Sequence, residues 1–165
     1  MYGKQTERAI AALSRLAEVW DGGSTRLSAT DIARNRSLPG PMVAKLLTTL
    51  AQHGLVRGSP GPNGGYCLSR APSEITLEHV HAIFERTDTS PLCPFGGGVC
   101  GVGDPCALHN RLVAVQESVR DLLRNTTFQV FLDAIRSGRK PTPSDAVPVG
   151  PRRSFRASKP RNSSR

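Results

Sequence analysis

The sequence lacks the long apolar runs of a membrane protein. Its 165 residues are 38% hydrophobic and only 5% aromatic, and it has no stretch of about 18 consecutive apolar residues, so no membrane-spanning helix is expected. Residues 1–7 lead into a segment of mixed polarity rather than the apolar core of a secretory signal. A chain of this composition can bury one modest core. We therefore expect a cytoplasmic protein with one folded body and a tail.

The sequence is also poor in cysteine, with four in the chain. Because disulfides are rare in the cytosol, we expect reduced thiols that are available to bind a metal, rather than a disulfide framework. No nucleophile–base pair or pair of carboxylates stands at a spacing suited to catalysis outside the cysteine group. The sequence therefore predicts neither an enzyme nor a small-molecule substrate.

The formal net charge of +9 is unevenly distributed along the chain. Residues 137–165 contain eight Lys or Arg and one acidic residue, together with five prolines. Such a segment cannot offset its ordering entropy, so a disordered basic tail is expected. Residues 21–72 carry six basic and two acidic residues, whereas residues 73–136 carry five basic and eight acidic ones. Only the first of these two segments is expected to face phosphate.

The first 72 residues show the order of elements of a winged helix-turn-helix. Ser28 with Asp31 fits a capping box for a short helix, and Pro41 suits the first position of the next helix. Two short strand-like segments then enclose a turn rich in glycine and proline. The predicted elements are helices over residues 6–20, 29–35 and 41–53, strands over 55–57 and 66–68, and a wing tip over 59–65.

Residues 73–136 are predicted to be helical on both sides of an irregular segment. Thr76 can cap a first helix, with buried positions expected at Leu77, Val80, Ile83 and Phe84. Residues 88–106 fit no periodicity and have no core of their own, so something else should order them. A long helix follows, with apolar residues at alternating intervals of four and three that are typical of a seam between two helices. These residues are Leu108, Leu112, Val115, Val119 and Leu122, and a short helix over 128–136 is expected to pack nearby.

The predicted helix-turn-helix supplies candidate DNA contacts. A recognition helix enters the major groove through its N-terminal residues, while a basic wing contacts the backbone or the minor groove. The candidates are Met42, Lys45 and Thr48 on the helix, Arg57 and Asn63 on the wing, and Arg26, Arg34 and Arg36 as phosphate contacts. The first two turns of the helix contain no Arg, Asn or Gln, which limits bidentate base readout. We therefore expect a contribution from DNA shape or from the wing.

Three cysteines and a histidine form a candidate metal-ligand set. Cys93, Cys100, Cys106 and His109 lie within 17 residues, in the pattern C-x6-C-x5-C-x2-H. Zinc sites usually pair their cysteines more closely, so the wide gaps mildly favour an iron–sulfur cluster over zinc. Cys67, between two strand residues, is expected to be a packing residue. The other histidines, His53, His79 and His81, are expected at the surface or at helix caps.

Together these features resemble the Rrf2 family of bacterial winged-helix regulators, of the IscR and NsrR types, over about residues 1–136. The resemblance rests on the ligand set above, on Lys4, Thr6, Glu7 and Ala9 in the opening helix, on Gly54-Leu55-Val56 before the wing and on Gly64-Gly65-Tyr66 after it. It implies a homodimer with crossed long helices, an iron–sulfur cluster beside them and two winged helices on double-stranded DNA. The chain differs from common family residues at Met42-Val43, Ala44 and Pro60, so operator preference is not carried over.

The resemblance leaves two cluster types open. In one branch of the family, three cysteines and a histidine that correspond to Cys93, Cys100, Cys106 and His109 hold a two-iron cluster. In another branch, the three cysteines hold a four-iron cluster with an acidic residue from the partner's first helix, and Glu7 stands at that place. His109 favours the two-iron type, although the first gap between the cysteines is one residue longer here than in that branch.

We therefore expect a mainly α-helical protein with three parts: a winged helix-turn-helix DNA-binding domain over residues 1–72, a cluster-binding loop and dimerisation helices over 73–136, and the disordered tail over 137–165. The expected function is a homodimeric transcriptional regulator, acting as a repressor, whose operator binding depends on a cluster that senses iron, redox or nitric oxide status. The alternatives are a zinc-binding or cluster-free winged-helix repressor and a small iron–sulfur electron carrier or assembly factor.

Overall fold

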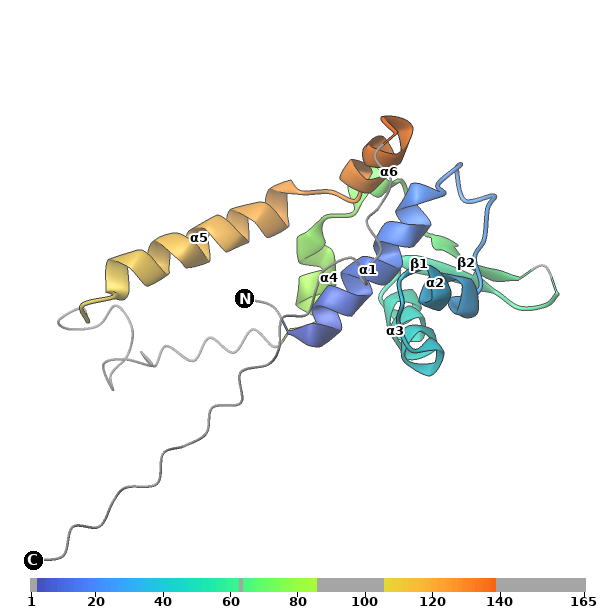
Figure 1. Cartoon of the computed structure of the whole chain (residues 1–165), viewed down its shortest axis with the longest axis horizontal. Helices are drawn as coiled ribbons and strands as arrows, with labels where there is room; N and C mark the ends of the chain where they lie inside the picture. The colour runs from blue at the N-terminus through green and yellow to red at the C-terminus, as the bar shows by residue number, and fades with distance from the viewer. Residues whose placement is uncertain (1–2, 63, 86–105, 139–165) are drawn as a thin grey trace, which may run out of the picture.

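The computed structural model describes residues 3–62, 64–85 and 106–138. In this part of the chain, helices form most of the body, a small two-stranded sheet lies at one side of it, and one long helix extends away from the rest (Figure 1). The elements are α1 (Lys4–Glu18), α2 (Ala29–Asn35), α3 (Gly40–Gln52), β1 (Val56–Ser59), β2 (Gly65–Leu68), the 3-10 turn η1 (Pro72–Glu74), α4 (Leu77–Phe84), α5 (His109–Asn125) and α6 (Gln129–Arg136). The prediction of a mainly α-helical winged fold is confirmed.

Helix α1 is at the centre of the core and contacts α2, α3, α4 and α6. Leu13 and Leu16 are buried between these neighbours, and Ala9, Ala12 and Ala17 allow the neighbouring helices to approach closely. The helix runs two residues ahead of the predicted range 6–20 at both ends. Its first turn is capped by a residue from the end of α4, a long-range contact that sequence periodicity does not reveal.

Helices α2 and α3 form the helix-turn-helix. The Ser28 hydroxyl accepts a hydrogen bond from the Asp31 backbone N–H at 3.0 Å, so the predicted cap and the range 29–35 of α2 are confirmed. The turn that follows includes Ser37 at a φ of 51°, and the Leu38 N–H donates to the Ala33 carbonyl at 2.9 Å. Helix α3 then buries the predicted face, which consists of Val43, Leu46, Leu47 and Leu50.

Strands β1 and β2 form the wing as an antiparallel hairpin in which Val56 pairs with Leu68 and Ser59 with Gly65. The edge of β2 also pairs with Leu27 in the loop before α2, through two hydrogen bonds of 2.8 and 3.0 Å with Tyr66. A Cβ on Gly64 would lie 2.2 Å from the Ser59 carbonyl oxygen. The hairpin therefore closes tightly only with glycine at that position.

Helix α4 begins at the predicted cap. The Thr76 hydroxyl accepts from the His79 N–H, and the Thr76 N–H donates to His79 Nδ1 at 3.0 Å, so His79 is a cap residue as expected. Leu77 and Val80 are buried, whereas Ile83 and Phe84, which were expected with them, are half-buried. The turn η1 was not predicted, because a single 3-10 turn has no hydrophobic period.

Helix α5 is joined to the body at its C-terminal end. Leu123 is its buried residue, the Thr126 carbonyl accepts from the Leu77 N–H at 2.9 Å, and Arg124 Nε lies 3.0 Å from a Glu78 carboxylate oxygen. No helix in the described ranges is both long and apolar enough to cross a membrane. The predicted disordered tail lies outside the described residues, apart from its first two.

Candidate DNA-binding surface and cluster ligands

The outer face of α3 carries the residues predicted to contact DNA. Because the buried residues fix the rotation of α3 against the core, Lys45 and Thr48 are exposed on the opposite face and Met42 is half-buried beside them. The Thr48 hydroxyl donates to the Ala44 carbonyl at 2.9 Å, which leaves its oxygen able to accept a hydrogen bond. The structure thus places these three predicted residues together along one side of the helix.

The wing and the loop before α2 add further cationic side chains. Arg26 and Arg57 are exposed, and Arg34 is exposed near the end of α2. A Cβ on Gly23, which has a φ of +88°, would lie 2.9 Å from Arg57 Nη2 and 3.6 Å from the Trp20 ring. The Arg57 guanidinium is therefore held close over the Gly23 backbone. The predicted wing residue Asn63 lies outside the described residues.

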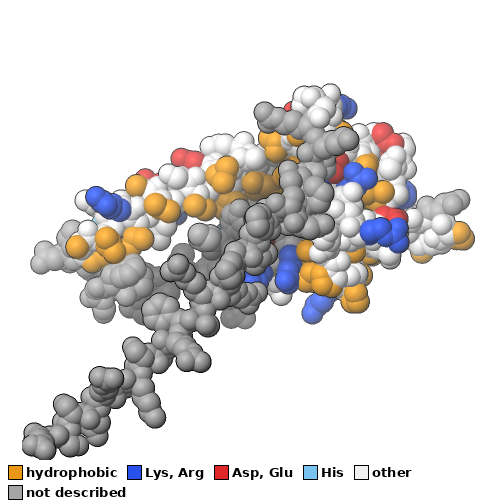
Figure 2. All heavy atoms as spheres, viewed as in Figure 1, with side chains coloured by type: hydrophobic (Ala, Val, Ile, Leu, Met, Phe, Trp, Pro, Cys, Tyr) orange, Lys and Arg blue, Asp and Glu red, His pale blue; other side chains and the backbone are white. Residues whose placement is uncertain are grey.

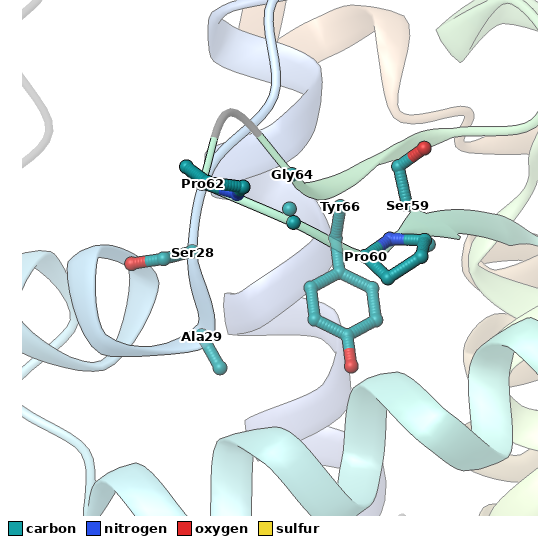
Figure 3. Close-up of a pocket in the computed structure, with 10 residues that line it drawn as sticks. Ser28, Ala29, Ser59, Pro60, Pro62, Gly64 and Tyr66 are labelled. Atoms are coloured by element: carbon teal, nitrogen blue, oxygen red, sulfur yellow. The ribbon is translucent and has the colours of Figure 1, made fainter.

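A solvent-open hollow of about 470 Å³ lies between the wing and the start of α2. Figure 3 shows the Tyr66 ring beside Pro60 on one side of the hollow and Ser28 with Ala29 on the other. A Cβ on Gly58 would lie 3.3 Å from the Tyr66 ring, so this aromatic side chain fills the space above β1. The wing is consequently supported by packing at its base.

Arg36, predicted as a phosphate contact, is instead bonded within the protein. Its Nη2 donates to Glu18 Oε1 at 2.6 Å and to the Ser14 hydroxyl at 2.9 Å, and its Nε donates to the Ala11 carbonyl at 3.0 Å. The side chains of Arg36 and Glu18 are 13% and 3% exposed, and Arg15 contacts the second Glu18 oxygen at 3.1 Å. Arg36 therefore joins α2 to α1, and we leave it out of the proposed DNA contacts.

The candidate cluster ligands lie only partly in the described residues. Cys106 is half-buried just before α5, His109 is the first residue of α5, and the His109 N–H donates to the Cys106 carbonyl at 2.9 Å. Glu7 is exposed in the first turn of α1. Cys93 and Cys100 are outside the described residues, within which no group of three or more His, Cys, Asp or Glu could hold a metal. Two of the four predicted ligands thus lie one helical turn apart.

Cys67 does not belong to this ligand region. It is 2% exposed on β2, among packed side chains. This placement matches its predicted role as a small packing residue, and it provides a cysteine that can serve as a control in metal-binding experiments.

A carboxylate that the sequence did not reveal caps the start of α1. Glu85, the last described residue before 86–105, accepts hydrogen bonds from the Thr6 hydroxyl and from the Gly3 backbone N–H. These bonds stabilise the ionised form, so the pKa of Glu85 lies below its ordinary value, with the Thr6 bond as the largest cause. Glu85 therefore connects the end of α4 to the turn of α1 that carries Glu7.

The apolar face of α5 is exposed in the described part of the chain. Leu108, Val115 and Leu122 from the predicted stripe are 43%, 61% and 51% exposed. Figure 2 shows hydrophobic side chains along the extended helix, and Figure 1 shows that helix projecting from the body. Exposed apolar stripes of this kind mark interaction surfaces, so α5 offers a face on which another protein surface can pack.

A helix-turn-helix with an exposed face, a two-stranded wing and a long uncovered helix define the class as winged-helix DNA-binding regulators. The sequence matches the Rrf2 family, described as iron-dependent transcriptional regulators, over residues 2–134. The chain therefore belongs to the Rrf2 family, and it is a DNA-binding transcriptional regulator rather than an enzyme. The resemblance predicted from the short motifs is confirmed.

Individual relatives agree with this assignment. The chain is 38% identical to a candidate HTH-type transcriptional regulator of Synechocystis sp. over 125 residues, 76% of this chain and 83% of that protein. It is 28% identical to the regulator IscR of Escherichia coli over 140 residues, 81% of this chain and 83% of that protein.

Solved structures agree on the fold. IscR of T. potens matches with a TM-score of 0.65 at 20% identity, over 89% of this chain and 96% of that chain. CymR of B. subtilis, described as the global cysteine regulator, matches with a TM-score of 0.64 at 22% identity, over 81% of this chain and 96% of that chain.

Proposed function

We propose that the chain is a homodimeric transcriptional regulator, active as a repressor, whose operator binding is controlled by an iron–sulfur cluster. The observation that carries this proposal is the position of Cys106 and His109, one turn apart at the start of the helix with the uncovered apolar face. Thiolate and imidazole are ligands suited to iron–sulfur centres. This donor set fits the iron dependence that the family description names.

The DNA contacts follow from the exposed faces. In the proposed complex, α3 lies in the major groove with Met42, Lys45 and Thr48 toward the bases, while the wing with Arg57 and Asn63 follows the adjacent backbone or minor groove. Arg26 and Arg34 contact phosphates. Support for this placement comes from the exposure of Lys45, Thr48, Arg57, Arg26 and Arg34.

Dimerisation follows from α5. Covering Val115 and Leu122 against a second copy would remove apolar surface from water, which stabilises the pair by about 25 cal/mol per Å² buried. Two copies related by a two-fold axis would present two α3 helices to half-sites about one DNA turn apart. A palindromic operator is expected for this reason.

The cluster ligands in this proposal are Cys93, Cys100, Cys106 and a fourth donor. His109 is the fourth ligand for a two-iron cluster, which we favour, and the partner's Glu7 is the alternative for a four-iron cluster. Bound at this site, the cluster supplies an iron centre that responds to iron supply, oxidants or nitric oxide. The residues of the chain hold it through thiolates, which must be deprotonated to bind.

The Glu85 cap offers a route from the ligand region to the DNA-binding helices. Glu85 ends α4 and is bonded to Thr6 and Gly3 at the start of α1, and α1 packs directly on α3. A displacement at the end of α4 would therefore reach α3 through one rigid helix. Such a displacement changes DNA affinity only if the cluster binds the two arrangements unequally.

The test is an oxygen-free purification followed by iron and acid-labile sulfide analysis and visible and Mössbauer spectra. The wild-type protein should be coloured, and Cys106→Ala should lose the colour while Cys67→Ala, which changes a buried cysteine outside the ligand set, should keep it. DNA affinity should differ between the cluster-bound and the chelated protein. Preparations with neither iron nor sulfide from any growth condition would refute the proposal.

Separate substitutions identify the fourth ligand. His109→Ala should alter the visible spectrum if a two-iron cluster is held by the histidine, whereas Glu7→Gln should leave it unchanged. The opposite pattern would assign the four-iron type with the partner's Glu7.

A zinc-stabilised or cluster-free repressor is the second candidate. Three cysteines and a histidine are also a common zinc ligand set, and the family includes a protein described as a cysteine regulator. A colourless protein with stoichiometric zinc, or with no metal and undiminished operator binding, would favour this candidate. A role as an electron carrier or assembly factor would require cluster binding without any affinity for DNA.

A further inference from the structure

Helices α1 and α3 meet at a small hollow beside the end of α4. Its volume is about 120 Å³, and we call it the α1–α3 notch. The notch has a cationic and polar rim and an apolar floor. The rim is formed by Arg8, Lys45, Gln5 and Thr49, and the floor includes Leu46 and Phe84.

Arg8 has unused hydrogen-bond donors in the notch. It is half-buried, and its Nη1 donates to the Met42 sulfur at 3.1 Å. A thioether is a weak acceptor, and a guanidinium has five N–H donors. The described residues that line the notch contribute a second cation, Lys45, and no carboxylate. The arrangement leaves donor capacity and positive charge that an anion can satisfy.

The size and lining of the notch point to a phosphate next to an apolar group. At about 120 Å³ the hollow is small, so it suits a group of a few heavy atoms rather than a large ligand. Arginine binds phosphate oxygens in a bidentate manner, which lysine supports as a point charge. The floor of Leu46 and Phe84 suits the carbon atoms of a sugar. The DNA backbone supplies a phosphate and a sugar together.

The notch also lies in the right place for DNA. Met42 and Lys45 line it and belong to the face of α3 that carries Thr48. Figure 2 shows Lys and Arg side chains on the lower edge of the body, where Figure 1 places α3 and the N-terminal end of α1. A helix in the major groove is flanked by a phosphate backbone on each side, so a residue of α1 beside α3 is positioned to reach one strand.

We propose that the α1–α3 notch binds a backbone phosphate of the DNA, with Arg8 as the main ligand and Lys45 as the second. This inference rests on the proposed placement of α3 in the major groove. It adds Arg8, which has no assigned role in DNA binding, to the binding surface. Because a bond to phosphate carries no base information, Arg8 contributes to affinity on every duplex alike.

The experiment compares Arg8→Gln with wild type by fluorescence anisotropy over a KCl series, on a short mixed-sequence duplex and on DNA from the protein's own promoter. Arg8→Gln should weaken binding to both duplexes by roughly tenfold. The slope of log K against log salt should become shallower by about 0.9 for each phosphate that the variant no longer neutralises. Arg8→Lys should retain the slope, and Arg120→Gln, an exposed charge on α5, should behave as wild type.

The possible results separate the two proposals. Wild-type protein with no salt-dependent affinity for either duplex would refute the proposed function itself. If wild type binds DNA but Arg8→Gln and Arg120→Gln have the same slope of log K against log salt, only the proposed phosphate site in the notch would be overturned. Circular dichroism and thermal unfolding confirm that the variant is folded. If Arg8→Gln is unstable, Arg8→Met, which removes the charge but keeps a long side chain, takes its place, and a Met variant with the same salt slope as Arg8→Lys would overturn the notch.

A further arm distinguishes DNA from a free anion. Thermal unfolding is measured in inorganic phosphate and in chloride at equal ionic strength. A backbone phosphate is supported if inorganic phosphate raises the Tm of neither wild type nor Arg8→Gln relative to chloride, while Arg8→Gln still has the shallower salt slope of DNA binding. Stabilisation of wild type alone by phosphate, with an unaltered DNA slope, would overturn that assignment in favour of a free oxyanion.

Discussion

Replacing Glu18 by Gln is predicted to destabilise the helix-turn-helix strongly. Both carboxylate oxygens are engaged, one by Arg36 at 2.6 Å and one by Arg15 at 3.1 Å, and the Glu18 side chain is only 3% exposed. Removing one partner of a buried pair costs about 3–5 kcal/mol, because the other charge stays buried without compensation. The Arg36 side chain keeps 13% exposure and two further acceptors, so the expected loss is near the lower end, about 3 kcal/mol.

A loss of this size is a large part of the roughly 5–15 kcal/mol that keeps a domain folded, and it corresponds to a fall in Tm of roughly 6–12 °C. Urea unfolding followed by circular dichroism at fixed protein concentration measures it. Arg15→Met serves as the control, because its side chain is 26% exposed and its ion pair should contribute about 0–1 kcal/mol.

The double variant Glu18→Leu with Arg36→Met tests the reasoning directly. Replacing a buried ion pair by apolar side chains of similar size is often neutral or stabilising, so the double variant should regain most of the stability that Glu18→Gln removes. A Glu18→Gln protein within about 0.5 kcal/mol of wild type, or a double variant less stable than either single variant, would refute the assignment of Arg36 to the core ion pair.

Three further predictions concern the wing, the dimer and the α1 cap. Gly64→Ala should distort the hairpin and weaken DNA binding severalfold, since the added carbon would lie 2.2 Å from the Ser59 carbonyl oxygen; hydrogen exchange of β1 and β2 checks this, and unchanged exchange would contradict it. If the proposed dimer forms through α5, Val115→Asp should be monomeric in sedimentation equilibrium under conditions where wild type is dimeric, without unfolding of the winged domain, and a persistent dimer would exclude α5 as the interface. Because the pKa of Glu85 is lowered in the folded protein, the carboxylate contributes its full stabilisation above the ordinary value of 4.5 and loses it as the pH falls through the lower folded value. Glu85→Gln should therefore make the free energy of unfolding less dependent on pH in that acidic range, and a dependence equal to that of wild type would argue against the cap.

Elements with local signals could be predicted from the sequence. The range of α2 agrees with its prediction, and the caps at Ser28 and Thr76 are in place, because a capping side chain and its backbone donor are three residues apart. The buried face of α3 followed from spacing alone. Each of these features is set by residues within one or two helical turns, so the sequence contains the necessary information.

Interactions between distant residues could not be predicted. Arg36 bonds to Glu18 across 18 positions and Glu85 to Thr6 across 79, and nothing in the local sequence distinguishes these side chains from solvated ones. For the same reason Arg36 was expected on DNA, and Arg8 was not considered for the binding surface. The predicted apolar stripe of α5 is present, and Val115 and Leu122 on it are exposed in the described part of the chain; what covers them cannot be predicted from spacing within one helix.

The attachment of α5 at one end has a mechanical consequence. The helix has 17 residues, so it spans about 25 Å at ~1.5 Å per residue, with Leu123 near its fixed end and His109 at the far end. A tilt of only about ten degrees at the base would carry the far end by about 4 Å over that length, more than a coordination bond tolerates. If the proposed cluster is bound at that end, a second copy packed along the exposed stripe of α5 would hold its ligands in place, and monomeric protein would load the cofactor less readily than the assembled form.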